Sequence, residues 1–113
     1  MKYIDQLDGI AKEDILKLHE KEKEYGGSWK KRGGANAFFM LCRKWDRLEH
    51  FVEKYNWDIF KSIEKDTRKE GVLDDIQDLR RYLMLVEAEM ICREKKDRNY
   101  KPDFVSHGFQ NDK

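Results

Sequence analysis

Apolar residues recur along the chain at spacings of three and four, the period of a helix that turns one face towards a core. In the last long segment Ile76, Leu79, Leu83, Val86 and Met90 follow one another at intervals of 3, 4, 3 and 4 residues. Runs of β-branched residues are missing, and the single proline lies close to the C-terminus. The pattern predicts an all-α protein, a small bundle of about four helices.

Glycines separate the predicted helices. Gly26 and Gly27 are expected to end the first helix, because glycine readily adopts the left-handed conformation of a helix C-cap, and Gly71 precedes the last helix. Residues 1–97 are expected to form one domain. Residues 98–113 have no periodicity and are predicted to be a flexible tail or an arm laid on a neighbouring subunit. The predicted helices cover roughly residues 10–24, 36–55, 57–69 and 72–96.

Composition narrows the possible partners. Of the 113 residues, 42% are charged and 39% hydrophobic, and a small domain of this kind often completes its core by oligomerising. The 24 basic and 23 acidic residues leave a net charge of +1, so no overall field directs the protein to DNA or to an anionic membrane. No segment approaches the roughly 20 apolar residues that a membrane span requires. A cytoplasmic protein is therefore expected.

Two acidic pairs lie at the borders of predicted apolar faces. The apolar arc of the second predicted helix is formed by Phe38, Leu41, Trp45, Leu48 and Val52. At about 100° per residue, Glu49 falls inside this arc, with Asp46 just outside it. Asp75 likewise falls inside the arc of the last helix, with Asp78 at its margin. A buried carboxylate must be paired, protonated or bound to a cation. The pairs indicate a site for Mg²⁺ or Mn²⁺, which prefer oxygen ligands, with salt bridges to arginines as the alternative.

The stretch YGGSWKKRGG, residues 25–34, combines glycines with basic and aromatic side chains. Backbone N–H groups beside glycine can approach phosphate oxygens, lysine and arginine supply charge, and tryptophan can stack on a base. The alternative is a helix cap and surface loop whose tryptophan packs on the bundle. Lys44 and Arg47 are expected either to hold phosphates or to pair with the acids. The candidate nucleotide-binding residues are Lys21, Tyr25, Ser28, Trp29, Lys30, Arg32, Lys44 and Arg47.

The order Asp46-x-x-Glu49 followed by Asp75-x-x-Asp78 resembles the ExxE…ExxD pattern of the MazG-like all-α nucleoside triphosphate pyrophosphatases, with Asp at 46 and 75 where Glu is usual. A more specific resemblance is to the small phage and bacterial "nucleotide modification associated" domains. Two segments carry it: EYGGSWKKRGGANAFFMLCRKWDRLE and GVLDDIQDLRRYLMLVEAE. The resemblance covers roughly residues 20–90. It implies a homodimer or homotetramer that binds a nucleotide through Mg²⁺, with these four acids as metal ligands, and cleaves a triphosphate to a monophosphate and pyrophosphate.

Three functions are therefore expected as alternatives. The first is a Mg²⁺-dependent nucleotide pyrophosphohydrolase, in which Glu49, expected to be the more buried acid of its pair, is the candidate general base. The second is a non-catalytic phage protein, in the cytoplasm of a bacterial host, that sequesters a cyclic or modified signalling nucleotide to counter host defence. The third is a helical protein-interaction module whose acids form only salt bridges.

Overall fold

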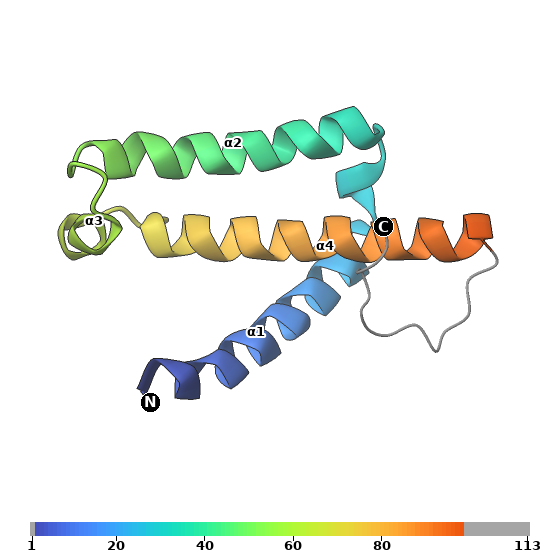
Figure 1. The fold of residues 1–113 in the computed structure, drawn as a ribbon, viewed down its shortest axis with the longest axis horizontal. Helices are drawn as coiled ribbons and strands as arrows, with labels where there is room; N and C mark the ends of the chain where they lie inside the picture. The colour runs from blue at the N-terminus through green and yellow to red at the C-terminus, as the bar shows by residue number, and fades with distance from the viewer. Residues whose placement is uncertain (1, 99–113) are drawn as a thin grey trace. The chain divides into compact units, whose positions relative to one another are not determined.

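The computed structural model describes residues 2–98, and their regular structure is entirely helical (Figure 1). No strand occurs within this range, so the predicted all-α bundle is confirmed. Residues 2–83 belong to one compact unit, and α4 continues from Met84 into a second. The predicted tail from residue 99 onward lies outside the described residues. The elements are α1 (Lys2–Tyr25), the 3₁₀-helix η1 (Ser28–Lys30), α2 (Gly34–Glu53), α3 (Ile59–Lys65) and α4 (Val72–Arg98).

The first helix is longer than predicted. It begins at Lys2 rather than near residue 10, because Ile4 and Leu7 carry the apolar stripe towards the N-terminus and helix continues through Gly9. Its end agrees with the prediction. Gly26 and Gly27 have φ angles of 46° and 75°, the left-handed conformation that ends a helix at little cost for glycine.

The third helix is shorter than the predicted range of 57–69. Asn56 and Trp57 have φ angles of 57° and 65°, so neither can belong to a right-handed helix. Asp58 then caps α3, since its side chain accepts hydrogen bonds from the backbone N–H groups of Phe60 and Lys61, each at 3.1 Å. The left-handed pair and the aspartate cap together delay the start of α3 to Ile59.

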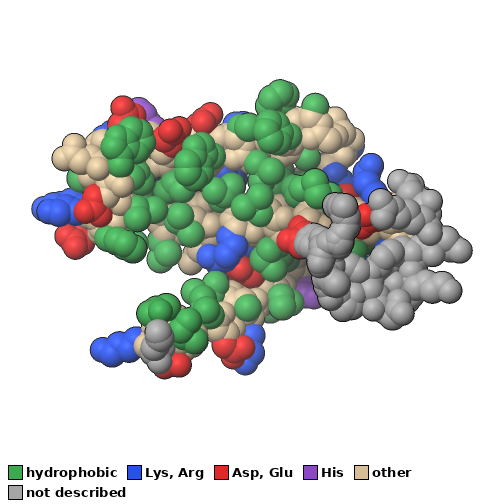
Figure 2. Space-filling model, in the orientation of Figure 1, with side chains coloured by type: hydrophobic (Ala, Val, Ile, Leu, Met, Phe, Trp, Pro, Cys, Tyr) green, Lys and Arg blue, Asp and Glu red, His purple; other side chains and the backbone are tan. Residues whose placement is uncertain are grey.

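The hydrophobic core is small. Leu48 and Val52 are buried, as the helical spacing predicted, and Phe51 and Val72 join them. Phe38 and Trp45 were predicted to share this face, but they are 59% and 51% exposed. Among the described residues only five hydrophobic side chains are buried, whereas sixteen large ones are exposed, so much of their apolar surface is open to solvent (Figure 2).

None of the described helices contains a stretch that is both long and apolar enough to cross a bilayer.

An ion-pair cluster attaches α1 to α4. Asp14 is the only buried residue of α1 and is 2% exposed. Arg80 donates two hydrogen bonds to its carboxylate, at 2.6 and 2.7 Å, and Arg81 donates a third at 2.7 Å. Hydrogen bonding from Arg80 lowers the pKa of Asp14 below its usual value, although burial acts in the opposite direction. Both oxygens of this carboxylate are satisfied, so Asp14 serves as a structural anchor.

Replacing Asp14 with asparagine removes the charge that neutralises Arg80 and Arg81. We expect the free energy of unfolding at neutral pH to fall by about 3 kcal/mol, because the two guanidinium groups lose their buried counter-charge. Since the folded-state pKa of Asp14 is lowered, its stabilisation is complete above about pH 4 and is lost as the pH falls through the folded-state value. Urea unfolding followed by circular dichroism should show a smaller loss of stability in acid for Asp14→Asn than for wild type. Parallel pH profiles would contradict the assignment.

Candidate functional site

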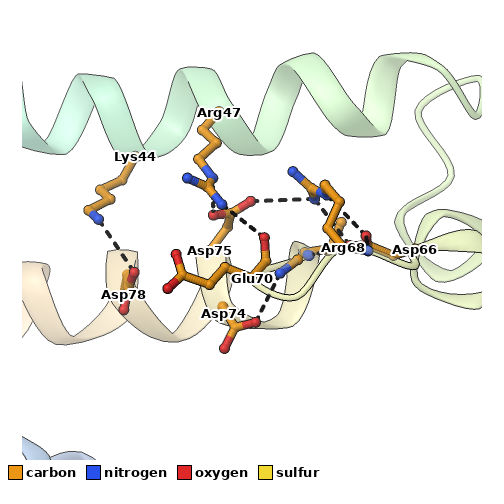
Figure 3. Close-up of polar contacts among 10 residues, drawn as sticks. Lys44, Arg47, Asp66, Arg68, Glu70, Asp74, Asp75 and Asp78 are labelled. Carbon is orange, nitrogen blue, oxygen red and sulfur yellow. Dashed lines mark hydrogen bonds and ion pairs between the residues drawn. The ribbon is translucent and has the colours of Figure 1, made fainter.

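Two charged pairs connect α2 to the first turns of α4 (Figure 3). Lys44 Nζ lies 3.4 Å from Asp78 Oδ2, and Arg47 Nε lies 2.8 Å from Asp75 Oδ1. Both cations and both acids are spaced i, i+3, so each pair projects from one face of its helix. The later residue of α2 meets the earlier residue of α4, so the two helices run antiparallel through this contact. Of the predicted alternatives for Lys44 and Arg47, pairing with acids is what the structure contains.

Asp75 is the most unusual residue of this contact. It is 3% exposed, and its Oδ2 atom has no hydrogen-bond partner. Arg68 Nη2 lies 3.8 Å from that oxygen, beyond hydrogen-bonding distance. Burial raises the pKa of Asp75, while the charges of Arg47 and Arg68 oppose the rise. A buried carboxylate with one unsatisfied oxygen remains able to accept a further donor or a cation.

Arg68 holds the loop before α4 in place. Its guanidinium donates hydrogen bonds to both oxygens of Asp66, at 3.0 and 3.1 Å, and lies 3.8 Å from the centre of the Phe51 ring. Asp66 also accepts a hydrogen bond from the backbone N–H of Val72, the first residue of α4. Hydrogen bonding from Arg68 lowers the pKa of Asp66 strongly. The Asp66 carboxylate occupies the space that a side chain at Gly71 would need. The backbone carbonyl of Gly71 accepts a hydrogen bond from the N–H of Asp75 at 2.9 Å.

An aromatic contact lies further along the same face of α4. Trp29 of η1 packs edge-on against Tyr82, with ring centres 5.9 Å apart. Tyr82 follows Asp78 by four residues and Asp75 by seven, so these side chains lie on one side of the helix. The Tyr82 hydroxyl is buried without a hydrogen-bond partner, and burial raises its pKa. Tyr82 was not among the predicted site residues, although this spacing was a signal for it.

Asp46 and Glu49, the other predicted metal ligands, do not join this contact. Both are exposed, and at about 100° per residue they lie on the flank of α2 opposite Lys44 and Arg47. The predicted burial of Glu49 is wrong, because α2 buries the Leu48 side of its wide apolar face and leaves the Trp45 side in solvent. Within residues 2–98 no group of three or more acidic, histidine or cysteine side chains is arranged to hold a metal ion. The expected four-carboxylate cluster is therefore not formed there.

The predicted nucleotide-binding residues are divided between two places. Lys44 and Arg47 reach the carboxylates of α4, and the half-buried Trp29 reaches Tyr82. The packing of Trp29 on the bundle matches the structural alternative for that residue. The remaining predicted residues are exposed, on the last turns of α1 or around η1; they are Lys21, Tyr25, Ser28, Lys30 and Arg32.

Comparisons of the chain with protein-family models, with curated proteins and with solved structures find no match.

Gly71→Ala tests how closely the loop before α4 is packed. The added methyl group would overlap the Asp66 carboxylate, which Arg68 and Val72 hold in place. We expect the free energy of unfolding to fall by about 1–3 kcal/mol, the usual cost of overpacking. Gly34→Ala is the matched control, because an added Cβ there meets nothing within 4 Å. Denaturant unfolding should separate the two variants, and equal stabilities would contradict the described packing.

Proposed function

We propose that the α2–α4 contact binds a nucleotide together with a divalent cation, Mg²⁺ or Mn²⁺. The observation that carries the proposal is Asp75, which is 3% exposed and has one oxygen without a hydrogen bond. Asp78 lies one turn away, and Lys44, Arg47 and Arg68 surround the two acids. Carboxylates that suit a cation therefore lie next to cations that suit phosphate.

Two carboxylates are sufficient for this type of site. Mg²⁺ in phosphate-binding sites is commonly held by one or two protein carboxylates, with the substrate phosphates and water completing its shell. Asp75 and Asp78 would hold the ion, which would neutralise charge on the phosphate oxygens. Lys44 and Arg47 would then exchange their carboxylate partners for phosphate oxygens, with guanidinium well suited to paired hydrogen bonds. After this exchange the two acids would be neutralised by the ion, and the two basic side chains by the phosphates, so no charge of the half-buried contact would be left unpaired.

In this proposal the aromatic contact would receive the rest of the nucleotide. Tyr82 lies seven positions after Asp75, about 10 Å along a helix axis. The Tyr82 hydroxyl, buried without a partner, would hydrogen-bond a base or sugar, and the Trp29 ring beside it offers an apolar surface for stacking. The proposed order is therefore phosphates near Arg47 and the nucleoside near Tyr82.

Cleavage of the bound nucleotide is the more specific form of the proposal, and binding without chemistry is its alternative. Pyrophosphohydrolysis needs a base to take a proton from the attacking water. Glu49, the predicted base, is exposed on the other flank of α2. The geometry thus supports nucleotide binding more directly than hydrolysis, and it is equally compatible with sequestering a signalling nucleotide.

Nucleotide binding should raise the melting temperature of the full chain in the presence of Mg²⁺, since a ligand that prefers the folded state stabilises it. For a domain of this size we expect roughly 5 °C for each kcal/mol gained. Asp78→Asn should abolish the Mg²⁺-dependent part of the shift, and so should Asp75→Asn. Asp78 is the safer test of the two, because its side chain is 44% exposed and contributes less to folding.

Two variants of exposed acids on α2 serve as controls for this measurement. Glu53→Gln should leave the ligand-induced shift unchanged. Asp46→Asn should do so if the site is the described α2–α4 contact, but should remove the shift if all four predicted acids hold the ion. No shift in wild type with any canonical or modified nucleotide, with or without Mg²⁺, would refute the proposal.

Hydrolysis is tested separately by product analysis. Incubation with each triphosphate and Mg²⁺ should release pyrophosphate and a monophosphate in wild type, and Asp75→Asn should lose the activity. Glu49→Gln should lower the turnover number if Glu49 is the base. Recovery of unchanged nucleotide from a protein that binds it would assign the sequestering function instead.

A further inference from the structure

Two aspartates lie on either side of one guanidinium group in the loop before α4 (Figure 3). Arg68 Nη2 donates a hydrogen bond to Asp66 Oδ2 at 3.1 Å, and the same nitrogen lies 3.8 Å from Asp75 Oδ2. The second distance is too long for a hydrogen bond. The oxygen of Asp75 that has no hydrogen bond is therefore one that Arg68 approaches but does not reach.

The contacts of Asp66 fix the orientation of Arg68. Asp66 accepts hydrogen bonds from Nε and Nη2 of the guanidinium, and from the backbone N–H groups of Arg68 and Val72. The Phe51 ring, centred 3.8 Å from the guanidinium carbon, supports the flat face of the same group. The paired hydrogen bonds to Asp66 thus direct the guanidinium away from the second carboxylate.

The movement that would join Arg68 to Asp75 is small. A shift of about 1 Å would bring Nη2 within hydrogen-bonding distance of Asp75 Oδ2. Asp75 is 3% exposed, and a buried carboxylate with an unsatisfied oxygen would be stabilised by a further charged donor. Asp66 therefore opposes a pairing that the burial of Asp75 favours.

We propose that Asp66 is a positioning residue, which holds Arg68 away from Asp75 and so keeps Asp75 Oδ2 open to a divalent cation. The inference rests on the proposed function, in which this oxygen is a ligand of the ion. If Arg68 paired with Asp75 instead, its positive charge would lie where the ion binds and would repel it. Residues that orient a metal ligand without touching the metal commonly change metal affinity by about 10–100-fold.

Titration of the full chain with Mn²⁺, followed by the electron paramagnetic resonance of the free ion, tests this role. Asp66→Asn should weaken Mn²⁺ binding about tenfold, because the neutral side chain no longer holds Arg68 away from Asp75. In an Arg68→Gln background the same substitution should leave the affinity unchanged, since no guanidinium remains to be redirected. An Asp66 that acted only through its own charge, or only by supporting the loop, would give equal fold-changes in the two backgrounds. That result would overturn the proposal.

Asp74→Asn is the matched control for the loss of one acid. Asp74 belongs to the first turn of α4, and its carboxylate accepts the N–H of Gly71 at 2.9 Å instead of holding Arg68. This variant should weaken Mn²⁺ binding far less than Asp66→Asn does. A loss as large as that of Asp66→Asn would show that the charge of the loop matters and not the position of Arg68.

Gly71→Ala displaces Asp66 without changing any charge, and it serves if Asp66→Asn does not fold. The added methyl group would overlap the Asp66 carboxylate and move it from Arg68. This variant too should bind Mn²⁺ more weakly than wild type, but not in the Arg68→Gln background. Gly34→Ala, which meets nothing within 4 Å, should bind Mn²⁺ as wild type does. Unchanged affinity in a folded Gly71→Ala would contradict the proposal.

A crystal structure of Asp66→Asn separates this inference from the proposed function. Arg68 Nη2 should lie within about 3.2 Å of Asp75 Oδ2 in the variant. A separation still near 3.8 Å would overturn the positioning role, even if Mn²⁺ binding were weaker. Wild type that binds no Mn²⁺, alone or with nucleotide, would instead refute the proposed cation site, and the geometry of the variant would still decide whether Asp66 positions Arg68.

Discussion

The ion pair between Asp75 and Arg47 is the interaction on which the α2–α4 contact depends. A carboxylate that is 3% exposed would be costly to bury alone, and the guanidinium 2.8 Å away offsets that cost. The same pair, with Lys44 and Asp78 one turn away, sets the antiparallel register of the two helices. Arg68 adds a third cation from the loop, so the burial of one acid organises three segments of the chain.

The two buried aspartates of the chain have different roles because their hydrogen bonding differs. Asp14 receives three short hydrogen bonds from two arginines, which satisfy both its oxygens and lower its pKa. Asp75 has one oxygen without a hydrogen bond, and its pKa is raised by burial despite two nearby arginines. A fully satisfied carboxylate gains nothing from a ligand, whereas an incompletely satisfied one does. This contrast is why the proposed site is centred on Asp75.

Spacing along the sequence predicted the helices and which residues share a helix face, but not which part of a wide face is covered. The predicted apolar face of α2 included both Leu48 and Trp45, and the structure buries only the Leu48 side, which leaves Glu49 in solvent. The prediction that Asp75 lies within the buried face of α4 was correct, because that side of the helix is covered. Asp14 was missed, since its partner Arg80 is 66 residues away and no local pattern links them.

The small core and the attachment of α1 by ion pairs both leave apolar side chains exposed. α1 is attached to the rest of its unit by charge, and its apolar side chains, most of them exposed, contribute little to the described core. The exposed Phe38 and Trp45 on α2 extend the same argument to a second helix. Ion pairs fix where these helices lie but add little net stability, because desolvation offsets most of their attraction. The described residues thus leave more large hydrophobic side chains exposed than they bury.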